Sequence, residues 1–106
     1  MQKNIQMSHK ANTIDFILDI SYAFQRSRVL LTACEFEIFS IIGERGLSSE
    51  SIAHKIDTDK TATDRLLNAL CGLELLTKKE GIFYNTPISM KHLVHGSNEF
   101  LGNLEY

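Results

Sequence analysis

The sequence is poor in the features that mark cofactor sites, membrane segments and secreted proteins. Its six glycines never occur as G-x-G, so it carries neither the dinucleotide fingerprint nor a phosphate-binding P-loop. It contains no run of about 18 apolar residues, and the polar N-terminus MQKNIQMSHKANT lacks the apolar core of a signal peptide. These absences predict a soluble, cytoplasmic protein without a cofactor site of its own.

A strong charge of one sign is also missing. The chain of 106 residues has 11 Lys and Arg residues against 13 Asp and Glu residues, which gives a formal charge of −2. No overall basic field therefore attracts nucleic acid, and such binding would need a local patch. A chain of this length fits one domain with a modest core.

Cysteine is scarce, and its context argues against catalysis. Cys34 lies in LLTACEFEIF and Cys71 in LLNALCGLELL, apolar helical patterns that predict buried, reduced thiols in a reducing compartment. Of the four histidines, only His92 and His95 have the spacing of two ligands on one helical face, and the sequence supplies no clear third ligand. We therefore predict no catalytic, cofactor-binding or metal-binding residue in this chain.

What the sequence does contain is an informative order of elements between residues 46 and 87. A short helix capped by Ser48 precedes a turn, a longer apolar helix and two β-prone stretches on either side of Gly81. The expected bounds are 48–56 for the first helix, 57–60 for the turn, 61–76 for the second helix, and 76–79 and 82–85 for the strands. This order predicts a mainly α fold, a winged helix-turn-helix with a small two-stranded β-wing.

Further helices are expected on both sides of this segment. Two precede it, at 13–24 and at about 27–43, and Thr86-Pro87 begins another that extends to about Val94. We expect a flexible N-terminus at 1–12, the folded winged-helix unit at 13–96, and the start of a connector helix to an absent catalytic domain at 97–106.

The 13–24 helix is apolar nearly all round, with eight apolar residues among the eleven from Ile14 to Phe24. A helix of this kind must be buried on more than one side, and the core of a small domain covers only one face. The sequence therefore predicts a partner chain on the other face, in an intertwined dimer through the N-terminal helices.

Two functions are usual for a winged helix, reading DNA or serving as a dimerisation scaffold. Over Ser48–Leu76, three basic residues stand against five acidic ones, which is the wrong sign for a surface that meets phosphates. Lys78, Lys79 and Asn68 are the residues that favour DNA binding. A DNA-binding transcriptional regulator stays open as an alternative, as does a stand-alone protein-interaction module that pairs through the 13–24 helix.

Three runs together resemble one known family. They are SRVLLTACEFEIFSIIGERGLSSESIAHKI, TATDRLLNALCGLELLTKKEGIFYNTP and KHLVHGSNEFLG, within a similarity that covers about residues 20–102. They resemble the N-terminal dimerisation domain of S-adenosylmethionine-dependent small-molecule O-methyltransferases of the hydroxyindole, plant phenolic and polyketide-tailoring type. The resemblance implies a homodimer, and S-adenosylmethionine and the catalytic base in a separate domain beyond this chain.

The resemblance also implies roles for individual residues. By position, Tyr22, Phe24 and Gln25 are expected to help close the partner subunit's substrate pocket, with simple interface packing as the alternative for each. The residues expected at the dimer interface are Ile14, Ile17, Leu18, Ile20, Phe24 and Leu31. The sequence leaves open which small-molecule hydroxyl substrate such an enzyme would take.

Overall fold

The computed structural model describes residues 9–97 and 99–101. Its longest element is α1 (His9–Glu35), one continuous helix of 27 residues. At 1.5 Å per residue it is roughly 40 Å long. The prediction of two helices, at 13–24 and about 27–43, is wrong, because no glycine or proline interrupts the chain between His9 and Glu35.

The N-terminal boundary also differs from the expectation. Residues 9–12, expected within a flexible segment, belong to α1, while residues 1–8 lie outside the described part of the chain. The first helix ends at Glu35, and not at about residue 24 as predicted. Glu37 adopts the left-handed conformation (φ 58°, ψ 37°), and α2 (Ile38–Ile42) starts in a new direction that places Ile38 and Phe39 in the core.

Two capped helices follow. After β1 (Leu47–Ser48), α3 (Ser49–Ile56) begins with the predicted cap, because the Ser48 hydroxyl accepts a hydrogen bond from the Ser51 amide at 3.1 Å. Asp59 caps α4 (Lys60–Gly72) in the same way. α4 ends four residues before the predicted Leu76, because Glu74 is left-handed (φ 65°) and leads the chain into the sheet.

The predicted hairpin is confirmed with its bounds. β2 (Leu76–Lys79) pairs antiparallel with β3 (Ile82–Asn85) across Glu80 and Gly81, which both have positive φ, as the tightest hairpin turns require. The two-stranded expectation is wrong in one respect. β1 also pairs antiparallel with β3, so the sheet has three strands in the order β1-β3-β2.

The last described helix is α5 (Pro87–His92), with the predicted proline at its first turn. It ends two residues before Val94. The connector helix expected at 97–106 does not form in Ser97 or Glu99–Leu101, and the remaining residues of that segment lie outside the described ones.

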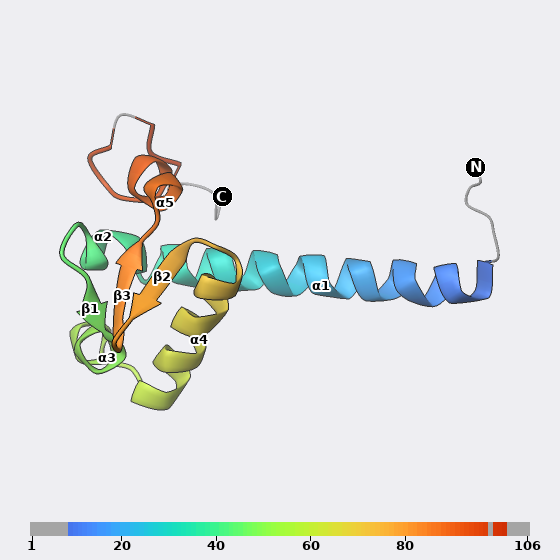
Figure 1. Cartoon of the computed structure of the whole chain (residues 1–106), viewed down its shortest axis with the longest axis horizontal. Helices are drawn as coiled ribbons and strands as arrows, with labels where there is room; N and C mark the ends of the chain where they lie inside the picture. Colours follow the sequence, from blue (N-terminus) through green and yellow to red (C-terminus); the bar gives the residue numbers. More distant parts are fainter. Residues whose placement is uncertain (1–8, 98, 102–106) are drawn as a thin grey trace.

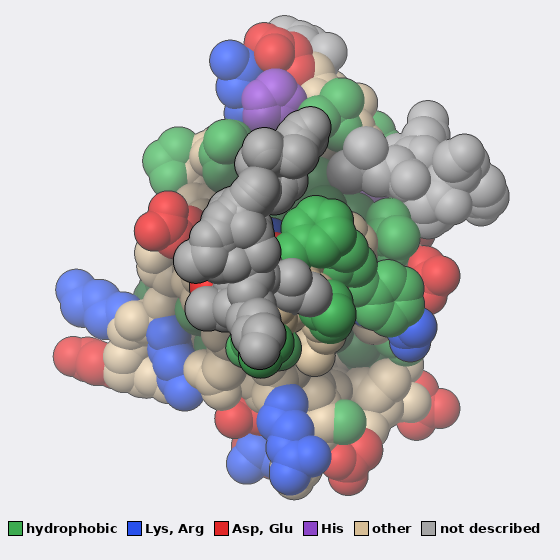
Figure 2. Space-filling view, turned by 90° about the vertical axis from the view of Figure 1, so that its right-hand side faces the viewer, with side chains coloured by type: hydrophobic (Ala, Val, Ile, Leu, Met, Phe, Trp, Pro, Cys, Tyr) green, Lys and Arg blue, Asp and Glu red, His purple; other side chains and the backbone are tan. Residues whose placement is uncertain are grey.

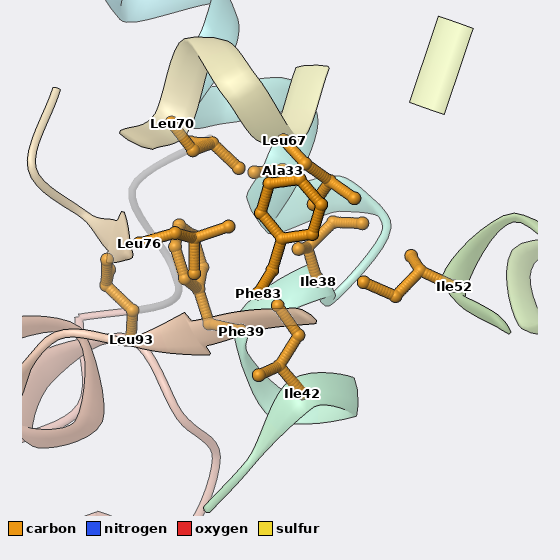
Figure 3. Packing of buried hydrophobic residues seen from close by; sticks show 10 residues of the cluster. All are labelled: Ala33, Ile38, Phe39, Ile42, Ile52, Leu67, Leu70, Leu76, Phe83 and Leu93. Atoms are coloured by element: carbon orange, nitrogen blue, oxygen red, sulfur yellow. The ribbon is translucent and has the colours of Figure 1, made fainter. Parts of the chain in front are cut away.

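The hydrophobic core lies where α2, α3 and α4 meet one face of the sheet, with Phe83 of β3 at its centre (Figure 3). Leu67 and Leu70 come from α4, and Ile52 comes from α3. Among residues 14–35 of α1, whose burial the structure describes, Ala33 alone is fully buried in the core. The N-terminal part of α1 therefore projects from the folded body as an arm (Figure 1).

Candidate dimerisation surface

The projecting part of α1 carries an apolar surface that its own chain does not cover. Every residue from 14 to 28 is exposed. Figure 2 faces the end from which this arm projects, and hydrophobic side chains gather near the centre of that view. The large apolar side chains on it, with their exposed fractions, are Ile14 60%, Phe16 64%, Ile17 59%, Leu18 41%, Ile20 56%, Tyr22 49% and Phe24 60%.

This set has a clear energetic meaning. Each side chain of this size stabilises an assembly by roughly 1.5–3 kcal/mol when it becomes fully buried. Isolated exposed apolar residues are ordinary, but a contiguous group on one helix marks an interaction surface. Burial of these side chains against another molecule would therefore be energetically favourable.

The residues predicted for the dimer interface divide into two groups. Ile14, Ile17, Leu18, Ile20 and Phe24 are all exposed on the arm. Leu31 is half-buried and stands outside the cluster of residues packed on the core. Phe16 is the most exposed of the large apolar residues and was not among those predicted, although it belongs to the same apolar run.

The structure brings together two of the three residues predicted to contribute to a substrate pocket. Tyr22 and Gln25 line a groove of about 290 Å³ between α1 and α4, and Ala69 and Leu73 form its far wall. Arg26 lines the same groove, and no signal in the sequence distinguished it. Phe24 does not line it, and the Arg28 guanidinium carbon lies 5.6 Å from the Phe24 ring centroid instead.

The two thiols are half-buried, rather than buried as predicted. Burial raises the pKa of the Cys71 thiol above its ordinary value, and the positive charge of Lys78 offsets part of that rise. A raised pKa leaves less thiolate at neutral pH, and thiolate is the nucleophilic form. The environment of Cys71 is thus that of a packing residue.

The helix that would enter a DNA groove uses its amide side chain within the protein. In α4 the Asn68 side-chain nitrogen donates to the Asp64 carbonyl at 2.9 Å and to the Asp64 carboxylate at 3.0 Å. The Asn68 side-chain oxygen accepts from Lys78 at 3.5 Å. Two of the residues that favoured DNA binding are therefore engaged with each other.

The described residues contain neither a metal-binding cluster nor a membrane-spanning helix. Among residues 9–97 and 99–101, no three His, Cys, Asp or Glu side chains gather closely enough to hold a metal ion. Within the same ranges, no helix combines the length and the apolar content that crossing a lipid bilayer requires.

The structure is a small, mainly helical domain with a three-stranded antiparallel sheet, and one long helix exposes a row of large apolar side chains. The family model that matches residues 18–95 is the O-methyltransferase dimerisation domain. This match covers most of the chain, and the chain belongs to that family.

Individual proteins agree with this assignment. The chain is 39% identical over 87 residues to acetylserotonin O-methyltransferase of Gallus gallus, an alignment that covers 76% of this chain and 25% of the relative. A family 2 O-methyltransferase of Planctomyces limnophilus, solved with apigenin, is 28% identical with a TM-score of 0.75. That alignment covers 83% of this chain and 27% of the other.

A third match extends the likeness in fold. Human N-acetylserotonin methyltransferase, solved in complex with SAM, superimposes with a TM-score of 0.77 at 23% identity, over 93% of this chain and 30% of the human chain. The chain thus spans about a quarter to a third of the length of the proteins that it matches.

Proposed function

We propose that this chain forms a homodimer through the exposed arm of α1. The observation that carries the proposal is the group of large apolar side chains, each more than two-fifths exposed, on a helix of a dimerisation-domain family. A second copy of the same surface is self-complementary by symmetry, so one patch serves both subunits. The interface residues of the proposal are Ile14, Ile17, Leu18, Ile20, Phe24 and Leu31.

Co-expression of two differently tagged copies tests this proposal. We expect one tag to recover the other from the same cells at about half the amount of the captured copy, because dimers of the captured copy with itself are recovered too. A purified mixture of separately expressed copies, combined just before capture, controls for association on the resin. Recovery of one tag alone in both samples would contradict the homodimer.

We further propose that the chain acts as the dimerisation part of an S-adenosylmethionine-dependent small-molecule O-methyltransferase. Its support is the family match together with relatives named as acetylserotonin O-methyltransferases. Binding of the methyl donor and catalysis would belong to sequence outside these 106 residues. The α3–α4 pair and the β2–β3 hairpin then serve as a winged-helix scaffold rather than as a reader of DNA.

The native reading frame tests this second proposal. We expect the endogenous protein to be longer by a couple of hundred residues and to transfer a methyl group from S-adenosylmethionine to a small hydroxyl-bearing acceptor. An endogenous protein of 12.0 kDa that binds no methyl donor would contradict it. Duplex DNA binding that weakens steeply with salt would favour the regulator instead.

The proposal also gives residues of α1 a role in the substrate pocket of the partner subunit. Tyr22 and Gln25 share the groove between α1 and α4, and Tyr22 is about half exposed. In the dimer we expect these residues, with Phe24, to approach the pocket of the other subunit. In the full-length enzyme, Tyr22→Ala should then raise KM for the acceptor and leave the affinity for S-adenosylmethionine unchanged. An unchanged KM would assign Tyr22 to the interface alone.

A further inference from the structure

The two histidines that stand three residues apart in sequence, His92 and His95, lie where the chain leaves α5. The described residues that follow fold back beside α5 (Figure 1). The Leu101 amide donates to the His92 carbonyl, and the Ser97 hydroxyl donates to the Lys91 carbonyl. We name residues 95–97 and 99–101 the strap.

His95 connects the strap to the corner between α1 and α2. Its backbone amide donates to the Ser40 hydroxyl of α2 at 2.9 Å. Its ring Nε2 lies 3.5 Å from the Glu37 carboxylate, and its ring centroid lies 4.3 Å from that of Phe100. One residue therefore touches α2, the corner and the strap itself.

The contact between His95 and Glu37 lies at the surface, at the point where the helical direction changes. Glu37 has the left-handed conformation that separates α1 from α2. The His95 and Glu37 side chains are 56% and 60% exposed. Because exposed ion pairs contribute little free energy, a change in the charge of one member is enough to alter how often such a contact is made.

Both histidine rings face groups that can only accept a hydrogen bond. The His95 Nε2 faces the Glu37 carboxylate, and the His92 Nδ1 lies 3.0 Å from the Glu99 backbone carbonyl oxygen. A neutral imidazole carries one N–H, whereas the imidazolium ion carries two and adds a positive charge. Protonation therefore strengthens both contacts.

The other charged groups of this region do not reverse that effect. Glu35 at the end of α1 has the same sign as Glu37, and α2 carries no charged residue. The opposing positive charges are Lys91 of α5 and the second histidine ring. The Lys91 ammonium lies 3.4 Å from the Glu99 carboxylate, which offsets its charge. Among the side chains that the structure describes, Glu37 is the acidic group within 4 Å of the His95 ring nitrogens.

We infer that the strap closes in a pH-dependent way: it packs against the α1–α2 corner when His92 and His95 are protonated, and it loosens when they lose those protons. Histidine is the side chain that changes its charge between about pH 5 and pH 8. The inference goes beyond the proposed function, because it depends on neither dimerisation nor methyl transfer. In a longer chain, the strap would set the direction in which the sequence beyond residue 101 leaves the domain.

Hydrogen exchange of the Leu101 amide tests the inference on the 106-residue chain, because this amide bonds to the His92 carbonyl in the closed strap. NMR measures its protection factor, the ratio of the intrinsic to the observed exchange rate, at pH 5 and pH 8. We expect the protection factor to be roughly two- to fivefold higher at pH 5, which is the range of an exposed ion pair. A protection factor at pH 5 that is equal to or lower than that at pH 8 would overturn the inference.

Side-chain variants identify the groups responsible. We expect His95→Gln and Glu37→Gln each to reduce the pH 5 to pH 8 ratio of protection factors, and His95→Gln combined with His92→Gln to abolish it. His54→Gln, the matched control, replaces an exposed histidine of α3 and should leave the ratio unchanged. A merely structural role of His95 would lower the protection of Leu101 equally at both pH values. A ratio that His95→Gln leaves at the wild-type value would therefore overturn the inference.

Discussion

The Asn85 side-chain nitrogen donates a hydrogen bond to the backbone carbonyl of Phe39 at 2.9 Å, joining the end of β3 to α2. The same nitrogen donates to the Gly43 carbonyl, also at 2.9 Å. A single side-chain amide thus bonds two carbonyls at the end of α2, and the Phe39 carbonyl also accepts from the Gly43 amide at 2.9 Å.

We expect Asn85→Ala to lower the free energy of unfolding by about 1–3 kcal/mol, because the partly buried Gly43 carbonyl loses its side-chain donor and the Phe39 carbonyl keeps only the Gly43 amide. Asn85→Asp should cost at least as much at pH 7, since a carboxylate would face two carbonyl oxygens. Urea unfolding measures both, and the exposed Asn68→Ala serves as control. A loss for Asn85→Ala no larger than that of the control would contradict this role.

Gly46 and Gly81 form a matched pair for separating crowding from backbone strain. Their φ angles are nearly equal, at +83° and +81°. A Cβ on Gly46 would lie 2.6 Å from Cδ1 of the Tyr84 ring, whereas a Cβ on Gly81 would meet nothing within 4 Å. Both alanine variants therefore carry the left-handed penalty of about 1 kcal/mol, and only Gly46→Ala adds a clash.

We expect thermal or urea unfolding to show Gly46→Ala as the less stable variant by a further 1–3 kcal/mol, roughly. The clash would push Tyr84 away from the β1–β3 pairing, so near-ultraviolet circular dichroism should change in that variant alone. Equal stabilities for the two variants would show that Tyr84 moves aside without cost.

Cys71 provides a prediction about pH. Its pKa is raised in the folded chain, so at any pH near its ordinary value less thiolate is present than in the unfolded chain. We expect iodoacetamide to modify Cys71 more slowly in the native protein than in urea, with the native rate rising only at higher pH. Peptide mapping separates this site from Cys34. A native rate at pH 8 equal to the unfolded rate would contradict the shift.

The raised pKa of Cys71 also determines how the stability of the fold changes with pH. Because the folded state holds the proton more tightly, this thiol stabilises the fold below its ordinary pKa, and that contribution declines as pH rises through the raised value. Cys71→Ala should therefore reduce the loss of stability between pH 8 and pH 10. If the stabilities of the variant and the wild type fall equally with pH, the loss comes from other titrating groups.

Leu18→Asp tests the arm without endangering the domain. Leu18 is 41% exposed in the single chain, so the monomer should fold with an unchanged circular dichroism spectrum. In the dimer, an unpaired carboxylate in an apolar interface costs several kcal/mol, which amounts to a rise in Kd of roughly a hundredfold or more. Thr77→Asp, an exposed position in β2, adds the same charge outside the arm.

Size-exclusion chromatography with light scattering measures the outcome. We expect the Leu18→Asp chain to elute as a monomer at concentrations where the Thr77→Asp chain is a dimer. A dimeric Leu18→Asp chain would place the interface outside the arm of α1.

Local signals predicted much of the fold. The Ser48 cap, the proline at the start of α5 and the hairpin about Gly81 were all predictable, because each depends on residues adjacent in sequence. β1 was not, since Leu47 pairs with Phe83 from a distant part of the chain and a two-residue strand has no pattern of its own. The continuity of α1 follows from the absence of any helix breaker, which is a weaker signal than a cap or a turn residue.

The sequence predicted that the N-terminal helix carries an apolar surface in need of a partner, but it did not predict which residues line a groove. The apolar run from Ile14 to Phe24 indicated a helix that needs a partner, and its large apolar side chains are exposed. The groove beside Tyr22 combines α1 with residues at α4, so its lining depends on packing that periodicity does not encode. Arg26 belongs to this groove only because of that packing.

Sedimentation equilibrium of the wild-type chain across nanomolar to high micromolar concentration tests the central claim most directly. The chain mass is 12.0 kDa, and we predict a reversible transition to twice that mass within this range. A mass that stays at 12.0 kDa up to the highest concentration would contradict dimerisation through α1.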